Sequence, residues 1–100
     1  MGKFEINTDT SDKYRFNLKA TNGQVILSSQ GYTTKSACEN GIDSVKKNAQ
    51  DDAMFERNTA KDGSPFFNLK SSNGQVIGTS EMYSSTSAME TGIASVKSNA

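Results

Sequence analysis

The sequence is a tandem repeat of one unit. A shift of 51 positions aligns residues 1–49 with residues 52–100 without a gap, and about half of the aligned pairs are identical. Repeats of this kind are structural units that stack to bury a shared hydrophobic face. A chain of only about 50 residues buries too little of its surface to be comfortably stable alone. We therefore predict that repeat 1 (residues 1–50) and repeat 2 (residues 51–100) share one core, in a single domain spanning residues 1–100.

Each repeat begins with three segments that resemble strands. In the clearest of them, Tyr14, Phe16 and Leu18 alternate with polar residues. This period of two is typical of a half-buried strand. The predicted strands cover 3–8, 14–20 and 24–30 in repeat 1, and the third strand of repeat 2 covers 75–82.

An Asn-Gly pair separates the second and third strands of each repeat, at Asn22-Gly23 and Asn73-Gly74. This pair favours a two-residue type I′ hairpin, since that turn needs positive φ at both central positions. Such a turn would place Leu18 opposite Leu27 and Lys19 opposite Ile26. The resulting register assigns one set of residues to the inner face: Phe16, Leu18, Val25, Leu27, Phe67, Leu69 and Val76. It assigns Ile26 and Ile77 to the outer face.

Helices are predicted to end both repeats. After Tyr32 the apolar residues recur at helical spacing, and the same happens after Tyr83. The two apolar stripes are Cys38, Ile42, Val45 and Ala49, and Met89, Ile93, Val96 and Ala100. Ser36 with Glu39, and Ser87 with Glu90, have the spacing of a capping box, although the helices can instead start at Thr34 and Ser85.

The glycines within these helices, Gly41 and Gly92, lie beside the apolar stripe. Glycine within a helix costs about 1 kcal/mol relative to alanine. We interpret both as places where the helix backbone approaches the sheet closely. The order strand–strand–strand–helix, repeated once, predicts an α+β fold: one antiparallel sheet with two helices on one face.

Composition excludes several kinds of chemistry. Eleven basic and eleven acidic residues give a net charge of zero, which argues against strong electrostatic binding of nucleic acid. The chain has no histidine and a single cysteine, Cys38, so the commonest general base and any intrachain disulfide are excluded. No nucleophile, phosphate-loop or dinucleotide motif is present. We therefore predict a protein that is not an enzyme and needs no cofactor or metal.

The N-terminal residues lead directly into a strand-like pattern, without the apolar core of a signal peptide. No apolar run approaches transmembrane length. With a reduced cysteine, these features predict a soluble cytoplasmic protein without membrane association.

Four segments of the sequence resemble the YegP-like family of small bacterial proteins: Phe16-Asn17-Leu18-Lys19, Asn22-Gly23-Gln24-Val25-Ile26, Glu39-Asn40-Gly41-Ile42 and 76–83. The resemblance covers essentially the whole chain. It implies strand-rich halves joined in one sheet with exchanged strands, so that Ala53–Asn58 would pair across the boundary between the halves and not only within repeat 2. The function of this family is unassigned, and it therefore implies no catalytic or binding residues for this chain.

The best candidate surface is the sheet face away from the helices. Alternation places on this face the residues Glu5, Asn7, Asn17, Lys19, Glu56, Asn58, Asn68 and Lys70. They can bind a polar partner or simply form solvated cross-strand ion pairs, and the second alternative is the more common. We predict a non-catalytic accessory or interaction domain, with a protein partner or self-association. The alternative is a binding module for nucleic acid or a small polar ligand on the open sheet face.

Overall fold

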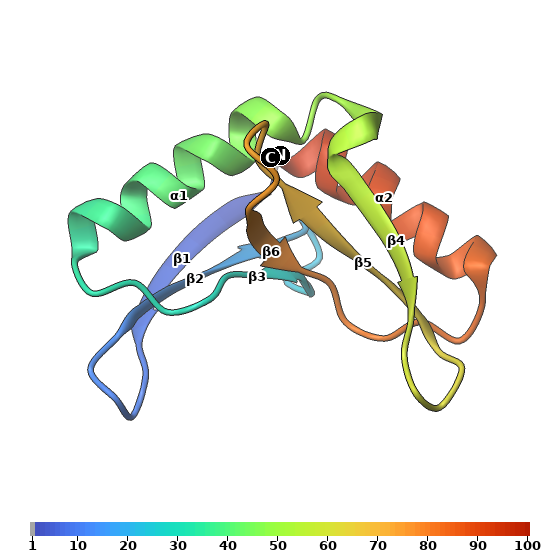
Figure 1. Ribbon diagram of the computed structural model, residues 1–100, viewed down its shortest axis with the longest axis horizontal. Helices are drawn as coiled ribbons and strands as arrows, with labels where there is room; N and C mark the ends of the chain where they lie inside the picture. Colours follow the sequence, from blue (N-terminus) through green and yellow to red (C-terminus); the bar gives the residue numbers. More distant parts are fainter. Residues whose placement is uncertain (1) are drawn as a thin grey trace.

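The computed structural model describes residues 2–100, and Figure 1 shows their arrangement. Two stretches of the chain, each with three strands followed by a long helix, are joined by a short 3-10 helix, η1 (Asp52–Met54). The strands are β1 (Lys3–Thr8), β2 (Tyr14–Lys19), β3 (Val25–Ser28), β4 (Phe55–Thr59), β5 (Pro65–Lys70) and β6 (Val76–Thr79). The helices are α1 (Lys35–Asn48) and α2 (Thr86–Asn99). The predicted order of elements is confirmed.

All six strands form one antiparallel sheet in the order β1-β2-β3-β6-β5-β4. The halves meet at its centre, where Ser28 of β3 lies opposite Thr79 of β6. Both helices lie on one side of this sheet (Figure 1). The predicted α+β class is confirmed. The segment Ala53–Asn58 contributes to β4, which pairs with β5 of the same half. The expected additional pairing of this segment across the boundary between the halves is wrong, because β4 is an edge strand beside β5 alone.

The predicted type I′ hairpins are wrong. The amide of Gly23 donates to the carbonyl of Ala20 at 2.9 Å, and the amide of Ala20 donates to the carbonyl of Gln24 at 2.9 Å. Gly23 has a φ of 86°, whereas Asn22 is not among the described residues with positive φ. This is the three-residue hairpin in which a type I turn is followed by a left-handed glycine.

The longer turn changes the register only beside the turn, and the predicted opposition of Leu18 and Leu27 is confirmed. A β-bulge after Leu18 places Lys19 opposite Val25, so that Ile26 becomes the extra residue. Ile26 and the corresponding Ile77 are only 5% and 6% exposed. The prediction that they lie on the outer face is therefore wrong. The prediction that Val25 and Val76 face inward is also wrong, because these residues lie opposite the outer-face residues Lys19 and Lys70.

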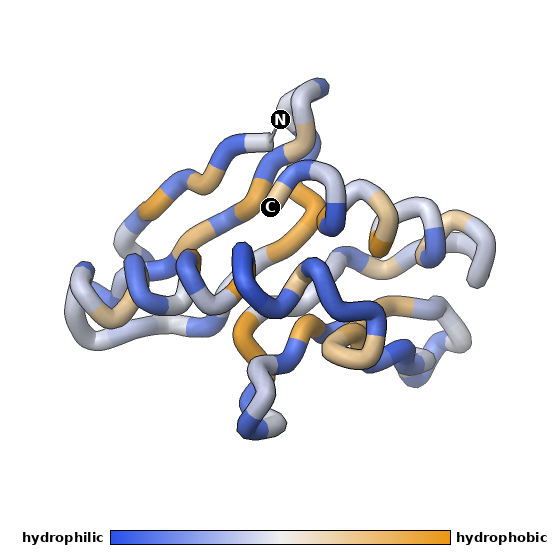
Figure 2. Tube along the Cα trace, turned by 90° about the horizontal axis from the view of Figure 1, so that it is seen from above, coloured by the Kyte–Doolittle hydropathy of each residue, from blue (hydrophilic) through white to orange (hydrophobic). Residues whose placement is uncertain are grey.

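The core fills the space between the sheet and the helices. Phe16 and Leu18 of β2 are fully buried, as are Phe67 and Leu69 of β5. Hydrophobic and hydrophilic residues alternate along much of the trace, and the outer loops are mostly hydrophilic or intermediate (Figure 2). The helices contribute Cys38, Val45, Ala49, Met89, Ile93 and Val96. The predicted apolar stripes thus face the core, with Ile42 and Ala100 only partly buried.

The two halves of the core differ at the centre of the sheet. Leu27 of β3 is fully buried. A Cβ placed on Gly78 of β6 would lie only 2.7 Å from Cγ and from Cδ2 of Leu27. The corresponding positions therefore share one space, which the Leu27 side chain fills.

The helices start at the earlier of the two expected positions. The side chains of Thr34 and Ser85 accept hydrogen bonds from the amides of Ala37 and Ala88, each at 3.0 Å. The capping boxes predicted at Ser36 and Ser87 are therefore wrong, and the hydroxyls of Thr34 and Ser85 cap the helices instead.

The close approach expected at Gly41 is present, and a tyrosine ring makes it. A Cβ at Gly41 would lie 2.5 Å from the Tyr32 hydroxyl oxygen and 3.0 Å from the Phe16 ring. The rings of Tyr32 and Phe16 stack with centroids 6.2 Å apart. The absence of a side chain at Gly41 lets α1 rest directly on these stacked rings.

Candidate functional site: the uncovered sheet face

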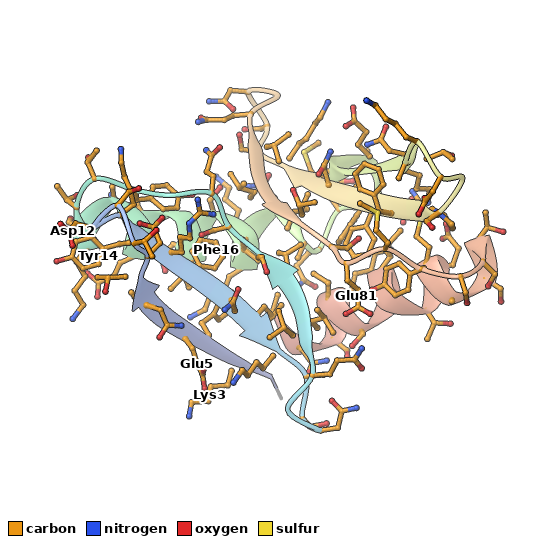
Figure 3. The ribbon with its side chains drawn as sticks, turned by 90° about the horizontal axis from the view of Figure 1, so that it is seen from below. Lys3, Glu5, Asp12, Tyr14, Phe16 and Glu81 are labelled. Atoms are coloured by element: carbon orange, nitrogen blue, oxygen red, sulfur yellow. The ribbon has the colours of Figure 1, made fainter. Side chains whose placement is uncertain are left out.

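One row of polar side chains crosses the uncovered face of the sheet from edge to edge. Directly opposed residues of neighbouring strands point to the same face. The register gives this row, which we call the polar row, as Glu5, Asn17, Ser28, Thr79, Asn68 and Glu56. Figure 3 views the molecule from the side of this face, with Lys3 and Glu5 on β1. Lys19 and Lys70 lie beside the two ends of the row.

In the second half, the predicted residues form a closed hydrogen-bond network around Glu56. One carboxylate oxygen, Oε1, accepts from Nδ2 of Asn58 at 3.0 Å and of Asn68 at 3.2 Å. The other, Oε2, accepts from Nζ of Lys70 at 2.6 Å. Oδ1 of Asn68 accepts from the hydroxyl of Thr79 at 2.8 Å. The second-half residues are thus brought together and largely satisfy one another.

The first half is organised differently. Glu5 forms ion pairs with Lys19 at 2.9 Å and with Lys3 at 3.9 Å. Within residues 2–100, the side chains of Asn7 and Asn17 make no hydrogen bond to another residue. Their amide groups are therefore available to an external partner, although the corresponding amides in the second half are occupied.

These contacts shift the pKa values of both glutamates. The hydrogen bond from Lys70, with those from Asn58 and Asn68, lowers the pKa of Glu56 from its ordinary value near 4.5 to about 2. The hydrogen bond from Lys19 also lowers the pKa of Glu5. Both carboxyls are therefore ionised acceptors near neutral pH, which suits binding or structure and does not suit general-acid chemistry.

Sequence reasoning missed the centre of the row. Ser28 and Thr79 were not among the predicted residues, because only the pairing of β3 with β6 makes them neighbours. Ser28 follows the inward-facing Leu27, and this alternation was a visible signal for that residue alone, because Thr79 follows Gly78. No local pattern, however, indicates which third strand lies beside which.

Elsewhere, the single cysteine and the aspartates between the halves have structural roles. Cys38 is fully buried, as expected of a core residue, and burial raises the pKa of its thiol. Asp51 accepts from the amide of Ala53 at the start of η1. Asp52 forms ion pairs with Arg57 and Lys97. No group of three or more potential metal-binding residues occurs among residues 2–100. In that same part of the chain, no helix has the length and apolar character needed to cross a membrane.

The fold and its uncovered polar face define a two-layer α+β domain. Comparison with known proteins identifies the family within this class. The sequence model of a domain of unknown function, DUF1508, matches residues 9–56 and again residues 60–100. A UPF0339 protein of Bordetella pertussis is 59% identical over 100 residues, covering 100% of this chain and 90% of that protein. The UPF0339 protein YegP of Escherichia coli is 47% identical over 98 residues, covering 98% and 89%. The chain belongs to this family of uncharacterised bacterial proteins, DUF1508/UPF0339, which includes YegP.

Solved structures agree with this assignment. The solution NMR structure of a UPF0339 protein from Shewanella oneidensis matches with a TM-score of 0.92 and 49% identity, covering 98% of this chain and 83% of that one. The solution NMR structure of E. coli YegP matches with a TM-score of 0.93 and 47% identity, covering 98% and 84%. The family has no established function, so any proposal for this chain must come from its own residues.

Proposed function

We propose that the protein is a non-catalytic interaction domain that binds a polar segment of a protein partner on its uncovered sheet face. The observation that carries this proposal is the difference between the halves of the polar row. Asn68 is bonded to its neighbours, whereas Asn17 at the corresponding position is not. A binding surface needs such free donors and acceptors, and a purely structural row does not. We also propose that the domain works in the cytoplasm, where Cys38 stays reduced.

Two repeats, 1–50 and 51–100, building one domain would account for this asymmetry. After duplication, one copy can keep its polar network for stability while the other changes. The free amides of Asn7 and Asn17, with the hydroxyl of Ser28, would then be the part of the surface open to a partner. The Glu5–Lys19 ion pair beside them supplies one charge of each sign.

The alternative function is binding of single-stranded nucleic acid or a small polar ligand at the same face. Phe66 favours it, because the register places this ring opposite Asn58 on the outer face, where a base can stack. The zero net charge counts against it.

An NMR titration separates these functions. Isotope-labelled protein is mixed in turn with a pool of random-sequence peptides, with a thymidine decamer and with a pool of polar metabolites. We expect the peptides to shift the side-chain amides of Asn7 and Asn17 and the backbone amide of Ser28. Replacing Asn17 by Ala would abolish these shifts, while Asn58→Ala, which changes an asparagine on the same face of the second half, would leave them. Shifts only on the helix side, or none, would contradict the proposal, and shifts with the decamer alone would favour the alternative.

A further inference from the structure

A guanidinium group joins the edge strand to the helix in the second half of the molecule. Nε of Arg57, on β4, donates to Oε2 of Glu90, on α2, at 2.6 Å, and Nη2 donates to Oε1 at 3.0 Å. Nη2 also reaches Asp52 at 3.2 Å. Such two-bond pairing is specific to arginine, whose planar fork matches a carboxylate. The pairing lowers the pKa of Glu90.

The first half has the carboxylate without the arginine. Glu39 of α1 corresponds to Glu90, but Ile6 of β1 stands where Arg57 would be. Within residues 2–100, the Glu39 side chain has no hydrogen-bond or ion-pair partner. Lys35 lies one helical turn earlier but forms no ion pair with Glu39 within that range. A lysine preceding a glutamate by four residues is also the less favourable order for such a pair.

Open space takes the place of the missing arginine. A cleft of about 710 Å³ lies between β1 and α1, with Phe4, Ile6 and Tyr14 among its apolar lining and Glu39 and Lys35 on the helix side. A second hollow of about 460 Å³ continues along α1, and Ile6 and Glu39 border it as well. The apolar side chains suit the aliphatic stem of an arginine and the Glu39 carboxylate suits its head, although the ammonium of Lys35 also lines the cleft and opposes a second cation.

We propose that this cleft, between β1 and α1, binds an arginine side chain of a protein partner. The arginine is carried on an extended segment that lies along the free edge of β1. Among the described strands β1 pairs only with β2, so its other edge has backbone groups available for another strand. A segment paired there points alternate side chains toward the helix side of the sheet, beside Ile6. The Arg57–Glu90 pair shows, within this chain, the contact that the incoming arginine makes with Glu39.

The probe that tests this inference is a capped heptapeptide of alternating threonine and valine with a central arginine. Two further peptides carry citrulline or lysine in place of the arginine. Citrulline keeps the shape without the charge, and lysine keeps the charge without the fork. We expect the arginine peptide to shift the Ile6 methyl groups and the Glu39 carboxyl carbon in NMR spectra. Its affinity should exceed that of each of the other two peptides by about two- to fivefold.

Variants of the protein test the same contact from the side of the cleft, with one further variant as a control. Glu39→Gln, at an exposed helix position, should abolish the preference for arginine, while Glu81→Gln, which removes a carboxylate that does not line this cleft, should not. Ile6→Arg reproduces the second half in the first. It should prevent peptide binding, and the new Nε–H should resonate close to that of Arg57.

Equal binding of the three peptides, no binding at millimolar concentration, or an unchanged preference in Glu39→Gln would each overturn the inference. It is independent of the proposed function of the polar row, because its signals come from Ile6 and Glu39. Failure of the polar-row proposal would instead be detected at Asn17 and Ser28, which do not line this cleft.

Discussion

The shared space at the centre of the sheet makes a quantitative prediction about Leu27 and Gly78. Leu27→Ala removes three buried carbons, which costs about 2.4 kcal/mol at ~0.8 kcal/mol each. Gly78 has no side chain to move into the vacated space, so a cavity remains and the total loss of unfolding free energy should reach about 3–4 kcal/mol. A domain of this size is stable by roughly 5–15 kcal/mol, and the variant should therefore still fold.

Gly78→Ala should also destabilise the protein, for the opposite reason. Its new Cβ would lie within 2.7 Å of two Leu27 side-chain carbons, closer than non-bonded carbons tolerate. Overpacking of this kind costs about 1–3 kcal/mol. Without the clash, exchanging glycine for alanine in a strand would instead stabilise the protein by about 0.5–1 kcal/mol. The sign of this effect thus tests the contact directly.

The double variant Leu27→Ala/Gly78→Ala is the decisive measurement. In it the methyl group introduced at position 78 enters the space that the leucine side chain has left, so the double variant should be no less stable than Leu27→Ala alone. Urea unfolding followed by circular dichroism gives all four free energies, and an unchanged m-value shows that the comparison is valid. Effects that add to within about 0.5 kcal/mol would refute the idea that the two positions share one space.

Three other predictions concern the polar row and the helix caps. Asn17→Ala should leave stability within about 0.5 kcal/mol of the parent, whereas Asn68→Ala, which breaks two side-chain hydrogen bonds, should lose about 1 kcal/mol in the same urea assay. The pKa of Glu56 is lowered to about 2 in the folded protein, so its contribution to stability is present above its unfolded value near 4.5 and is lost as the pH falls toward 2. Glu56→Gln should flatten the stability profile over that range, and a Glu56 pKa near 4.5 in an NMR titration would contradict the network. Thr34→Ala should cost about 0.5–2 kcal/mol and Ser36→Ala much less, and the reverse order would restore the rejected capping box.

The sequence predicted the parts of the fold that depend on local periodicity. Strand alternation around Phe16 and Leu18 identified a buried face, and the apolar stripe through Val45 identified the buried side of a helix. Both inferences hold because burial of a face repeats with the geometry of the element itself. The mid-helix Gly41 likewise indicated a close approach, although its partner, Tyr32, was not identified.

Local patterns were insufficient where one residue changed the register. The Asn22-Gly23 pair is compatible with both a two-residue and a three-residue turn, and only the second introduces the bulge. That bulge moves Ile26 from the outer face to the core. The free energy of burying Ile26 in the core favours one turn over the other. Turn propensity alone does not include that free energy.

By itself, then, the sequence determined the elements, their order and the polar character of the free sheet face. The tertiary structure alone decided which elements meet. In the folded protein, Ser28 lies beside Thr79 and the Leu27 side chain packs against Gly78. Arg57 pairs with Glu90, while Glu39 is unpaired among the described residues. Each of these contacts joins residues far apart in the sequence. Each depends on whether two surfaces fit in shape and charge when the two halves pair through β3 and β6.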